Sequence, residues 1–286
     1  MTNSRTLTNV FGVIGCPVGH SMSPAIQNQA FRSEHIDASY HAFHVEKKDL
    51  QNAVTGIKAL GVKGFNVTIP HKEALIPLLD EIESTAKAIG AVNTVVNEGG
   101  KLIGYNTDGK GFISSLRPYL SASLHDSRIL IIGAGGAARA IYFSLAAYGA
   151  GEIDLCNRTV LKAEKLIEEC PVKAKSRALS LQNAEKELNN YDIIVQTTSI
   201  GMHPHVEAKP LSLENIKSSA IVTDIIYNPI KTAFLKEAEE KGCKILDGTG
   251  MFVHQAALAF EHWTGLFPDV KEMHDIVMKK LGGTLC

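Results

Sequence analysis

The chemistry of this chain is concentrated around Lys72, in the segment 66–72 (NVTIPHK). Apolar and polar side chains alternate up to residue 69, which is the two-residue period of a half-buried strand. Pro70 cannot continue a strand ladder but suits the first turn of a helix, and good helix formers follow it. We therefore predict that Lys72 lies at a strand-to-helix join, where α/β folds bind their ligands. Asn66 and Thr68 stand beside it. The alternative is an ordinary surface lysine at a helix start.

A second group of residues is typical of dinucleotide binding. The apolar run 128–132 is followed at once by the turn 133–138 (GAGGAA), which fits G-x-G-x-x-G/A between a strand and a helix. The first glycine turns the chain, the second lets backbone approach a pyrophosphate, and the helix N-terminus supplies N–H groups. Small residues also occupy such turns for packing alone, but a second strand at 153–156 completes a βαβ unit. The expected cofactor contacts are Gly133, Ala134, Gly135, Gly136 and Ala137.

The end of that second strand indicates which dinucleotide binds. An NAD site places an acidic side chain there for the ribose 2′-hydroxyl, whereas an NADP site places a cation for the 2′-phosphate. This chain has Asn157, Arg158 and Thr159, with Lys162 one helical turn further on. We therefore predict NADP as the cofactor. The alternative is that Arg158 is only a solvated surface charge.

Alternating strand and helix patterns surround both groups and predict an α/β protein of two domains. The expected strands are 10–15, 40–45, 64–69, 94–97, 102–105, 128–132, 153–156, 192–196, 221–224 and 244–247. The expected helices are 25–31, with Ser23 as its N-cap, and 50–60, 109–120, 137–148 and 251–263. An N-terminal α/β substrate domain should comprise 1–107 plus the helices of 250–286, which return to it. Residues 108–249 should form a Rossmann-type, doubly wound NADP-binding domain.

Composition and charge exclude several classes of protein. The chain has 286 residues, 45% of them hydrophobic, with 29 Lys plus Arg against 30 Asp plus Glu. It lacks the basic excess that a nucleic-acid or anionic-membrane surface requires. The five cysteines contain no C-x-x-C pair, and no apolar run is long enough for a secretion signal or a membrane span. We expect a cytoplasmic monomer or homodimer with a small-molecule partner. His41 and His44 fall on opposite faces of a strand, so no metal site is expected.

The motifs together resemble those of the shikimate dehydrogenase family, over essentially the whole chain. They are 19–24 (GHSMSP), 66–72, 90–94 (GAVNT), 104–109 (GYNTDG), the glycine turn, 157–159, and 248–251 (GTGM) with Gln255. Several are independent of any nucleotide-binding fold, which makes the combination specific. The resemblance implies NADPH-dependent reduction of 3-dehydroshikimate to shikimate, on the route to chorismate and the aromatic amino acids.

The resemblance also implies residues that bind the substrate, a ring carboxylate with several hydroxyls. They are Ser21, Ser23, Thr68, Lys72, Asn93, Asp108, Tyr227 and Gln255. Ser21 and Ser23 lie near a predicted helix N-terminus, which suits a carboxylate. Structural alternatives stay open for three of the others: Asn93 could bond nearby backbone, Asp108 could cap the helix that follows it, and backbone groups could satisfy Gln255.

In the family, the residues that match Lys72 and Asp108 are catalytic. Hydride transfer from NADPH to a ketone leaves an alkoxide that must be protonated. A lysine ammonium would stabilise that oxyanion and donate the proton, with the aspartate orienting it. Burial and the positive end of a helix at Pro70 favour the neutral amine, whereas Asp108 favours the ammonium. The sequence leaves this balance open.

The chain departs from the family pattern at three positions. Gln196 stands where asparagine is common, and Ile225 where methionine often contacts the nicotinamide. Ile225, Gly248 and Met251 are expected cofactor contacts. Lys162 replaces a frequent arginine near the 2′-phosphate. A lysine makes no bidentate clamp, so we expect loose discrimination against NAD.

Two other functions remain open. One is a quinate/shikimate dehydrogenase that accepts NAD. The other, from a different class, is a nucleotide-sensing protein that kept the fold and lost turnover. The presence of Lys72 and Asp108 speaks against the second.

We expect the active site in a cleft between the two domains, and we expect that cleft to close around the substrate.

Overall fold

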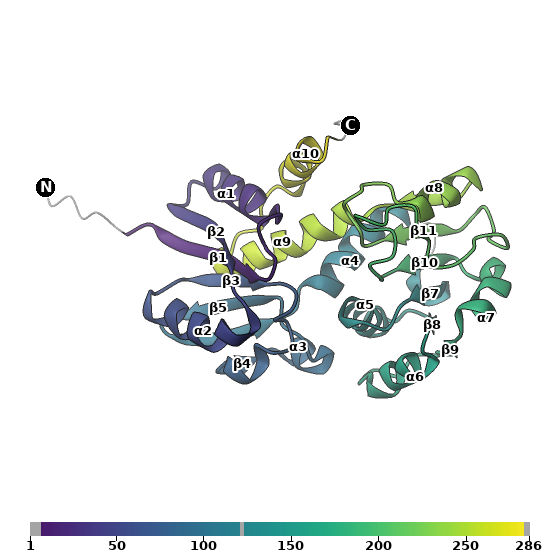
Figure 1. Ribbon diagram of the computed structural model, residues 1–286, viewed down its shortest axis with the longest axis horizontal. Helices are drawn as coiled ribbons and strands as arrows, with labels where there is room; N and C mark the ends of the chain where they lie inside the picture. The colour runs from purple at the N-terminus through teal and green to yellow at the C-terminus, as the bar shows by residue number, and fades with distance from the viewer. Residues whose placement is uncertain (1–6, 121–122, 283–286) are drawn as a thin grey trace, which may run out of the picture. The chain divides into compact units, whose positions relative to one another are not determined.

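The computed structural model describes residues 7–120 and 123–282. The N-terminal residues 1–6, to which the expectation on a secretion signal extends, and Cys286 lie outside the described residues. The chain divides into two compact units (Figure 1). The first comprises Met1–Thr107 and Ala256–Val277, and the second Asp108–Gln255 and Met278–Cys286. Each contains one six-stranded sheet in the described residues. The predicted α/β class is confirmed.

The first unit is built on a mixed sheet, sheet A, with the order β2-β1-β3-β5-β6-β4. Its strands are β1 (Asn9–Gly15), β2 (Ala38–His44), β3 (Gly64–Val67), β4 (Glu81–Ile82), β5 (Thr94–Glu98) and β6 (Lys101–Tyr105). β1 runs parallel to β2 and β3, whereas β5 is antiparallel to both β3 and β6. The carboxyl ends of β1, β3 and β6 therefore meet the amino end of β5 at one edge, called here the carboxyl edge of sheet A.

Helices cover both faces of sheet A (Figure 1). The helices of this unit are α1 (Ser23–Ser33), α2 (Leu50–Ala59), α3 (Ser84–Ile89), the second part of α9 (Gly248–Thr264) and most of α10 (Val270–Lys280). α2 places Leu50, Val54 and Ile57 in the core of one face, at the spacing of an amphipathic helix. On the other face, Phe31 of α1 packs against Phe260 of α9.

The segment after β3 corrects a prediction, because no helix starts at Pro70. Residues 68–75 form turns, and the next regular element is the short 3-10 helix Ile76–Leu78. Pro77 is the reason: a helix through 70–77 would lose the N–H group that residue 77 must donate. The Ile69–Pro70 peptide bond is cis. Lys72 therefore lies on a turn, and the argument from a positive helix end does not apply to it.

The N-terminus of α1 corrects a second prediction. The helix begins at Ser23 itself, and the N-cap position is Met22, which provides no side-chain cap. Ser23 is therefore not the N-cap. Instead, the hydroxyl of Ser21 accepts a hydrogen bond from the backbone N–H of Ser23 at 3.3 Å. The Ser23 side chain is buried and hydrogen-bonds Tyr40, whose pKa is raised mainly by burial.

The second unit is built on a parallel sheet, sheet B, with the order β12-β11-β10-β7-β8-β9. Its strands are β7 (Arg128–Ile132), β8 (Glu152–Cys156), β9 (Ala178–Leu179), β10 (Ile193–Gln196), β11 (Ile221–Asp224) and β12 (Lys244–Leu246). Numbered within the unit, this is the order 6-5-4-1-2-3 of a doubly wound dinucleotide-binding fold. The Rossmann-type prediction is confirmed. The strand order reverses between β7 and β10, and ligands bind at this switch point in such folds.

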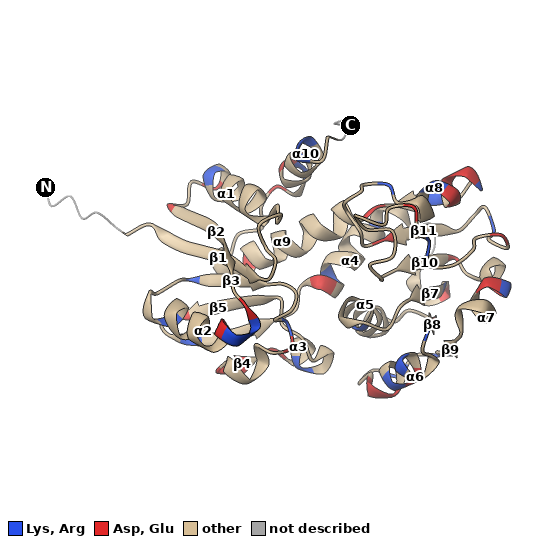
Figure 2. Ribbon diagram, in the orientation of Figure 1, with Lys and Arg blue, Asp and Glu red and all other residues tan. Residues whose placement is uncertain are grey.

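Helices also flank sheet B. They are α4 (Asp108–Leu116), α5 (Gly136–Ala147), α6 (Val160–Glu169), α7 (Leu181–Lys186), α8 (Ala233–Glu240) and the start of α9. α7 and α8 bury Ala184, Phe234 and Leu235 against one face. α5 packs on β7 and alongside α4. Lysines and glutamates lie along α6, and α8 carries one lysine and three glutamates (Figure 2). In the described part of the chain, no helix is long and apolar enough to cross a membrane.

Helix α9 passes from the second unit to the first between Gln255 and Ala256, several residues later than the expected return at 250. Close packing of its first two turns explains the difference. The backbone of Gly248 lies against Ile225, and a side chain at Gly111 of α4 would come within 2.7 Å of the backbone nitrogen of Gln255.

Candidate active site

Three of the predicted substrate-binding residues lie together at the carboxyl edge of sheet A. Thr68 donates its backbone N–H to the carbonyl of Ile14 at 3.0 Å. The carbonyl of Lys72 accepts from the N–H of Val92 at 2.9 Å, and Asn93 follows directly. Main-chain bonds thus fix the backbone of Lys72 beside the segment that carries Asn93, although the two lie far apart in sequence.

The side-chain amide of Asn93 is oriented by a buried network. Its Oδ1 accepts from the backbone N–H of Thr107 at 2.9 Å and from the Thr94 hydroxyl at 3.0 Å, and its Nδ2 donates to the Thr107 hydroxyl at 2.9 Å. Asn93 therefore does bond backbone, but that of Thr107, 14 residues further along the chain. Asn66 extends the network, because its Nδ2 donates to the Asn93 carbonyl and its Oδ1 accepts from the Tyr40 hydroxyl. That Asn66 holds Asn93 in place was not predicted from the sequence. The signal that could have found this role is an amide at the end of a buried strand, because a buried amide needs hydrogen-bond partners.

The loop between β1 and α1 brings the two predicted serines to the same unit. Ser21 is partly exposed, and its N–H closes a turn onto the Val18 carbonyl at 3.0 Å. Gly15, where this loop begins, allows close approach, because a side chain there would clash with the methyl group of Thr68. The loop that carries Ser21 therefore starts beside the strand end that carries Thr68 and Lys72.

The other three predicted substrate contacts belong to the second unit. Asp108 is the first residue of α4 and is buried. Tyr227 and Gln255 both contact Phe252: the two rings are 4.8 Å apart, and Gln255 Nε2 donates to the Phe252 carbonyl at 2.7 Å. A backbone partner for Gln255 is therefore observed. Burial raises the pKa of Tyr227, so its hydroxyl stays protonated at neutral pH and can donate a hydrogen bond.

The glycine turn has the shape that a pyrophosphate requires. Gly133 adopts φ +116°, and a side chain there would come within 2.6 Å of Thr197 Oγ1. Thr197 in turn donates to the Ile132 carbonyl at 2.7 Å, across the switch point between β10 and β7. Around Gly135 and Gly136, by contrast, the position of a side chain is open space. The backbone at the N-terminus of α5 is therefore accessible to a phosphate group.

The end of β8 offers cations and no carboxylate. Arg158, Thr159 and Lys162 are exposed, and the side-chain amide of Asn157 donates to the Thr159 carbonyl at 2.9 Å. Exposed positive charges after the second strand fit a 2′-phosphate. The residues present therefore fit NADP.

Two buried polar side chains shape the loops at the carboxyl ends of β10 and β11, and sequence reasoning missed both roles. Gln196 Oε1 accepts from the N–H of Thr198 at 2.8 Å, and its Nε2 donates to the Ile200 carbonyl at 2.9 Å. Asp224 accepts from the N–H of Ile226 at 3.0 Å and from the Thr232 hydroxyl at 2.8 Å. Asp224 thereby holds the loop of Ile225 against Gly248. Burial raises the pKa of Asp224 to about 7.

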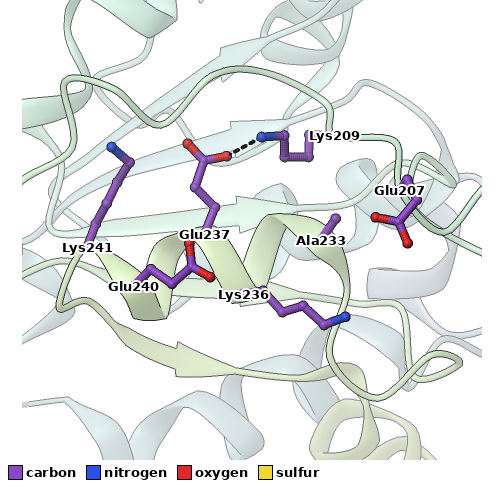
Figure 3. Close-up of a pocket in the computed structure, with 7 residues that line it drawn as sticks. All are labelled: Glu207, Lys209, Ala233, Lys236, Glu237, Glu240 and Lys241. Carbon is purple, nitrogen blue, oxygen red and sulfur yellow. Dashed lines mark hydrogen bonds and ion pairs between the residues drawn. The ribbon is translucent and has the colours of Figure 1, made fainter.

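A surface hollow of about 500 Å³ lies in the second unit (Figure 3). Charged side chains of both signs line it, among them Lys209 and Glu237, which form an ion pair at 2.6 Å. It lacks the apolar lining typical of a small-molecule site. No group of three or more His, Cys, Asp or Glu within 7–120 and 123–282 is arranged to hold a metal.

Family models match three parts of the chain. Residues 13–95 match the shikimate dehydrogenase substrate binding domain, residues 117–229 match shikimate / quinate 5-dehydrogenase, and residues 248–278 match the shikimate 5′-dehydrogenase C-terminal domain. These parts cover most of both units.

Individual proteins match over nearly the whole length. The chain is 56% identical to a shikimate dehydrogenase (NADP(+)) of Bacillus cereus over 277 residues, which cover 97% of this chain and 100% of the relative. A Listeria monocytogenes shikimate 5-dehydrogenase, solved with shikimate and NAD, is 36% identical with a TM-score of 0.89, covering 94% of this chain and 96% of that one. A Thermus thermophilus shikimate 5-dehydrogenase, solved with NADP(H) and shikimate, is 35% identical with a TM-score of 0.86, covering 95% and 99%. The chain thus belongs to the shikimate dehydrogenase family.

Proposed function

We propose that this chain is an NADP-dependent shikimate dehydrogenase, which reversibly reduces 3-dehydroshikimate to shikimate. The observation that carries the proposal is the gathering of Thr68, Lys72 and Asn93 at one sheet edge, in a chain that belongs to this family. The nicotinamide supplies the hydride. The chain has to bind the ring carboxylate and hydroxyls, orient the carbonyl, and move one proton.

The residues take distinct roles in this reaction. The Ser21 and Ser23 hydroxyls bind the carboxylate, and Thr68, Asn93, Tyr227 and Gln255 bind the ring through hydrogen bonds. The Lys72 ammonium stabilises the developing oxyanion and donates the proton to it, and in the reverse direction the amine takes the proton back. Asp108 orients Lys72 and bonds a ring hydroxyl. Positions 133–137 bind the pyrophosphate. Arg158 and Lys162 bind the 2′-phosphate, with Asn157 and Thr159 beside them. The nicotinamide is contacted by Ile225, Gly248 and Met251.

The direct test replaces Lys72 by alanine. Loss of the proton donor should lower kcat about 10²- to 10⁴-fold, the usual contribution of a general acid–base group. Shikimate should still bind, because its carboxylate contacts remain. Stopped-flow or steady-state rates of NADPH formation give kcat, and calorimetric titration with shikimate gives the binding constant.

Lys87→Ala is the matched control, because Lys87 is an exposed lysine of the same unit, on α3. It should leave both quantities unchanged. Turnover of K72A at the wild-type rate would contradict the catalytic role of Lys72. A wild-type protein that binds NADP⁺ without any turnover would instead favour the nucleotide-sensing alternative.

The cofactor and substrate preferences separate the two enzymatic alternatives. Rates with NADP⁺ and NAD⁺, each with shikimate and with quinate, should be highest for NADP⁺ with shikimate. Because Lys162 is a point charge without the fork of an arginine, NAD⁺ should retain measurable activity. A large preference for NAD⁺, or for quinate, would favour a quinate/shikimate dehydrogenase.

The cellular setting is proposed from the sequence. Cys16, Cys156, Cys170 and Cys243 are free thiols, which suits a reducing, cytoplasmic environment. We propose a monomer or homodimer, and sedimentation of the purified protein will distinguish the two.

A further inference from the structure

The turn that carries Lys72 has no regular secondary structure to hold it. The backbone N–H of His71 donates to the Thr68 carbonyl at 3.0 Å, and the His71 carbonyl accepts from Leu75 at 2.9 Å. The carbonyl of Lys72 accepts from Val92. These bonds tie the turn to itself and to the segment before β5. The Ile69 carbonyl accepts from the N–H of Cys16 at 3.0 Å and ties the start of the turn to the end of β1. None of these bonds reaches the end of β2, where the turn makes a further contact.

The side chain of His71 provides that contact. The imidazole is fully buried, and its Nε2 lies 2.6 Å from the carbonyl of Val45. A carbonyl only accepts, so Nε2 carries the hydrogen and donates it. Val45 directly follows β2, and its own N–H donates to the Gly15 carbonyl at the end of β1. His71 thus links the turn of Lys72 to the ends of two strands.

The other ring nitrogen shows that this residue is not simply filling space. Within the described part of the chain, Nδ1 of His71 is buried without a hydrogen-bond partner. Leaving such a group unpaired in the interior is unfavourable. A phenyl ring would fill much of the same volume without that cost, but it could not donate to Val45. The imidazole is therefore explained by the bond that Nε2 makes.

We propose that His71 is a positioning residue for Lys72, an inference that rests on the proposed dehydrogenase function. His71 fixes the backbone on one side of Lys72 through Val45, and Val92 fixes the Lys72 carbonyl itself. Together the two anchors set the direction in which the lysine side chain leaves the turn. Misplacement of a reacting group by about 1 Å can cost on the order of 10²-fold in rate.

The test compares two substitutions of His71. H71F keeps a ring and removes the donor, whereas H71Q keeps an N–H group that can reach the Val45 carbonyl. H71F should lower kcat about 10- to 100-fold and leave KM for NADP⁺ within about twofold, since the cofactor contacts are elsewhere. H71Q should recover most of kcat. The single tryptophan, Trp263, belongs to the same unit, and its fluorescence gives the folded fraction to which each rate is normalised.

A double substitution tests the route through Lys72. In a K72A background, H71F should cause no further loss of the residual rate, because effects that act through one group are not additive. An equal loss in both backgrounds would overturn the inference. So would a wild-type kcat in H71F, or the failure of both H71F and H71Q to fold, because the imidazole would then serve folding alone.

A wild-type protein with no activity on shikimate would refute the proposed function first. An active wild type, a K72A variant with little activity and an unaffected H71F would refute only the positioning role.

Discussion

Asp224 is a carboxyl group whose ionisation is coupled to folding. It is 1% exposed, and burial raises its pKa from 3.8 to about 7, although its two hydrogen bonds act in the opposite direction. Between these values the folded protein holds a proton that the unfolded chain has released. The contribution of Asp224 to the free energy of unfolding therefore falls as the pH rises through this range.

We predict that Asp224→Asn removes this dependence on pH. One pKa unit corresponds to about 1.4 kcal/mol, so the free energy of unfolding of the variant should rise relative to that of the wild type by about 3 kcal/mol between pH 4.5 and pH 7.5. Urea unfolding of both proteins at about pH 4.5 and about pH 7.5 measures the gain. Other carboxyl groups titrate in both proteins, so only the difference between the two is informative. The same difference at both pH values would contradict the prediction.

Single residues differ in how far the sequence reveals their surroundings. The closeness of Lys72 and Asn93 follows from strand order, since the turn of Lys72 follows β3 and Asn93 directly precedes β5, the antiparallel neighbour of β3. The bond from His71 to Val45 does not follow from any pattern, because it joins a side chain to a carbonyl 26 residues away. Backbone groups were one expected alternative partner of Gln255, but its particular bond to Phe252 depends on a rotamer that the sequence does not specify.

The contact between α4 and α5 depends on a glycine. A side chain at Gly109 would clash with Ser144 Oγ and the Ala140 carbonyl, both in α5. We predict that Gly109→Ala destabilises the protein by about 1–3 kcal/mol, the usual cost of overpacking. Urea unfolding followed by circular dichroism measures this change.

Gly56 of α2 provides the control for that substitution. Apart from its chain neighbours and the backbone of its own helix, no atom lies within 4 Å of the position that a side chain would take there. Gly56→Ala should therefore stabilise the helix by up to about 1 kcal/mol, because alanine loses less backbone entropy. Equal effects of the two substitutions would contradict the packing argument.

At the level of elements, the sequence predicted long strands and helices better than short segments. The parallel strands of sheet B are continuous apolar runs, and the β5–β6 hairpin has a Gly-Gly turn, so both were recognisable. α3 was not predicted, because it is short and its first N–H groups are capped by Glu83 rather than by a serine or threonine. The helix expected at Pro70 failed because Pro77 lies within its span. The crossing point in α9 could not be predicted, since the helix is apolar on nearly every face.

At the scale of the whole molecule, each unit has its own sheet and its own core. Each ligand should therefore slow amide hydrogen exchange mainly in the unit that binds it. We predict that NADP⁺ alone slows amide hydrogen exchange mainly at 133–139 and 157–162, whereas shikimate alone slows it mainly at 18–23 and 66–75. Bound ligand suppresses the local opening through which these amides exchange. Mass spectrometry of peptides after exchange measures both patterns. Protection of 66–75 by NADP⁺ alone, with none at 133–139, would contradict the assignment of the cofactor to the second unit.

The reversal of strand direction in sheet A also has a practical consequence for protein engineering. All the predicted substrate contacts of the first unit lie at or beyond its carboxyl edge, whereas the β5–β6 turn at Gly99 and Gly100 lies at the opposite edge. Both glycines have positive φ, and no atom lies within 4 Å of their side-chain positions. An exposed turn of this kind tolerates insertion. A fluorophore, an affinity peptide or a surface-attachment handle placed between these glycines would leave the substrate side of the sheet facing the solution.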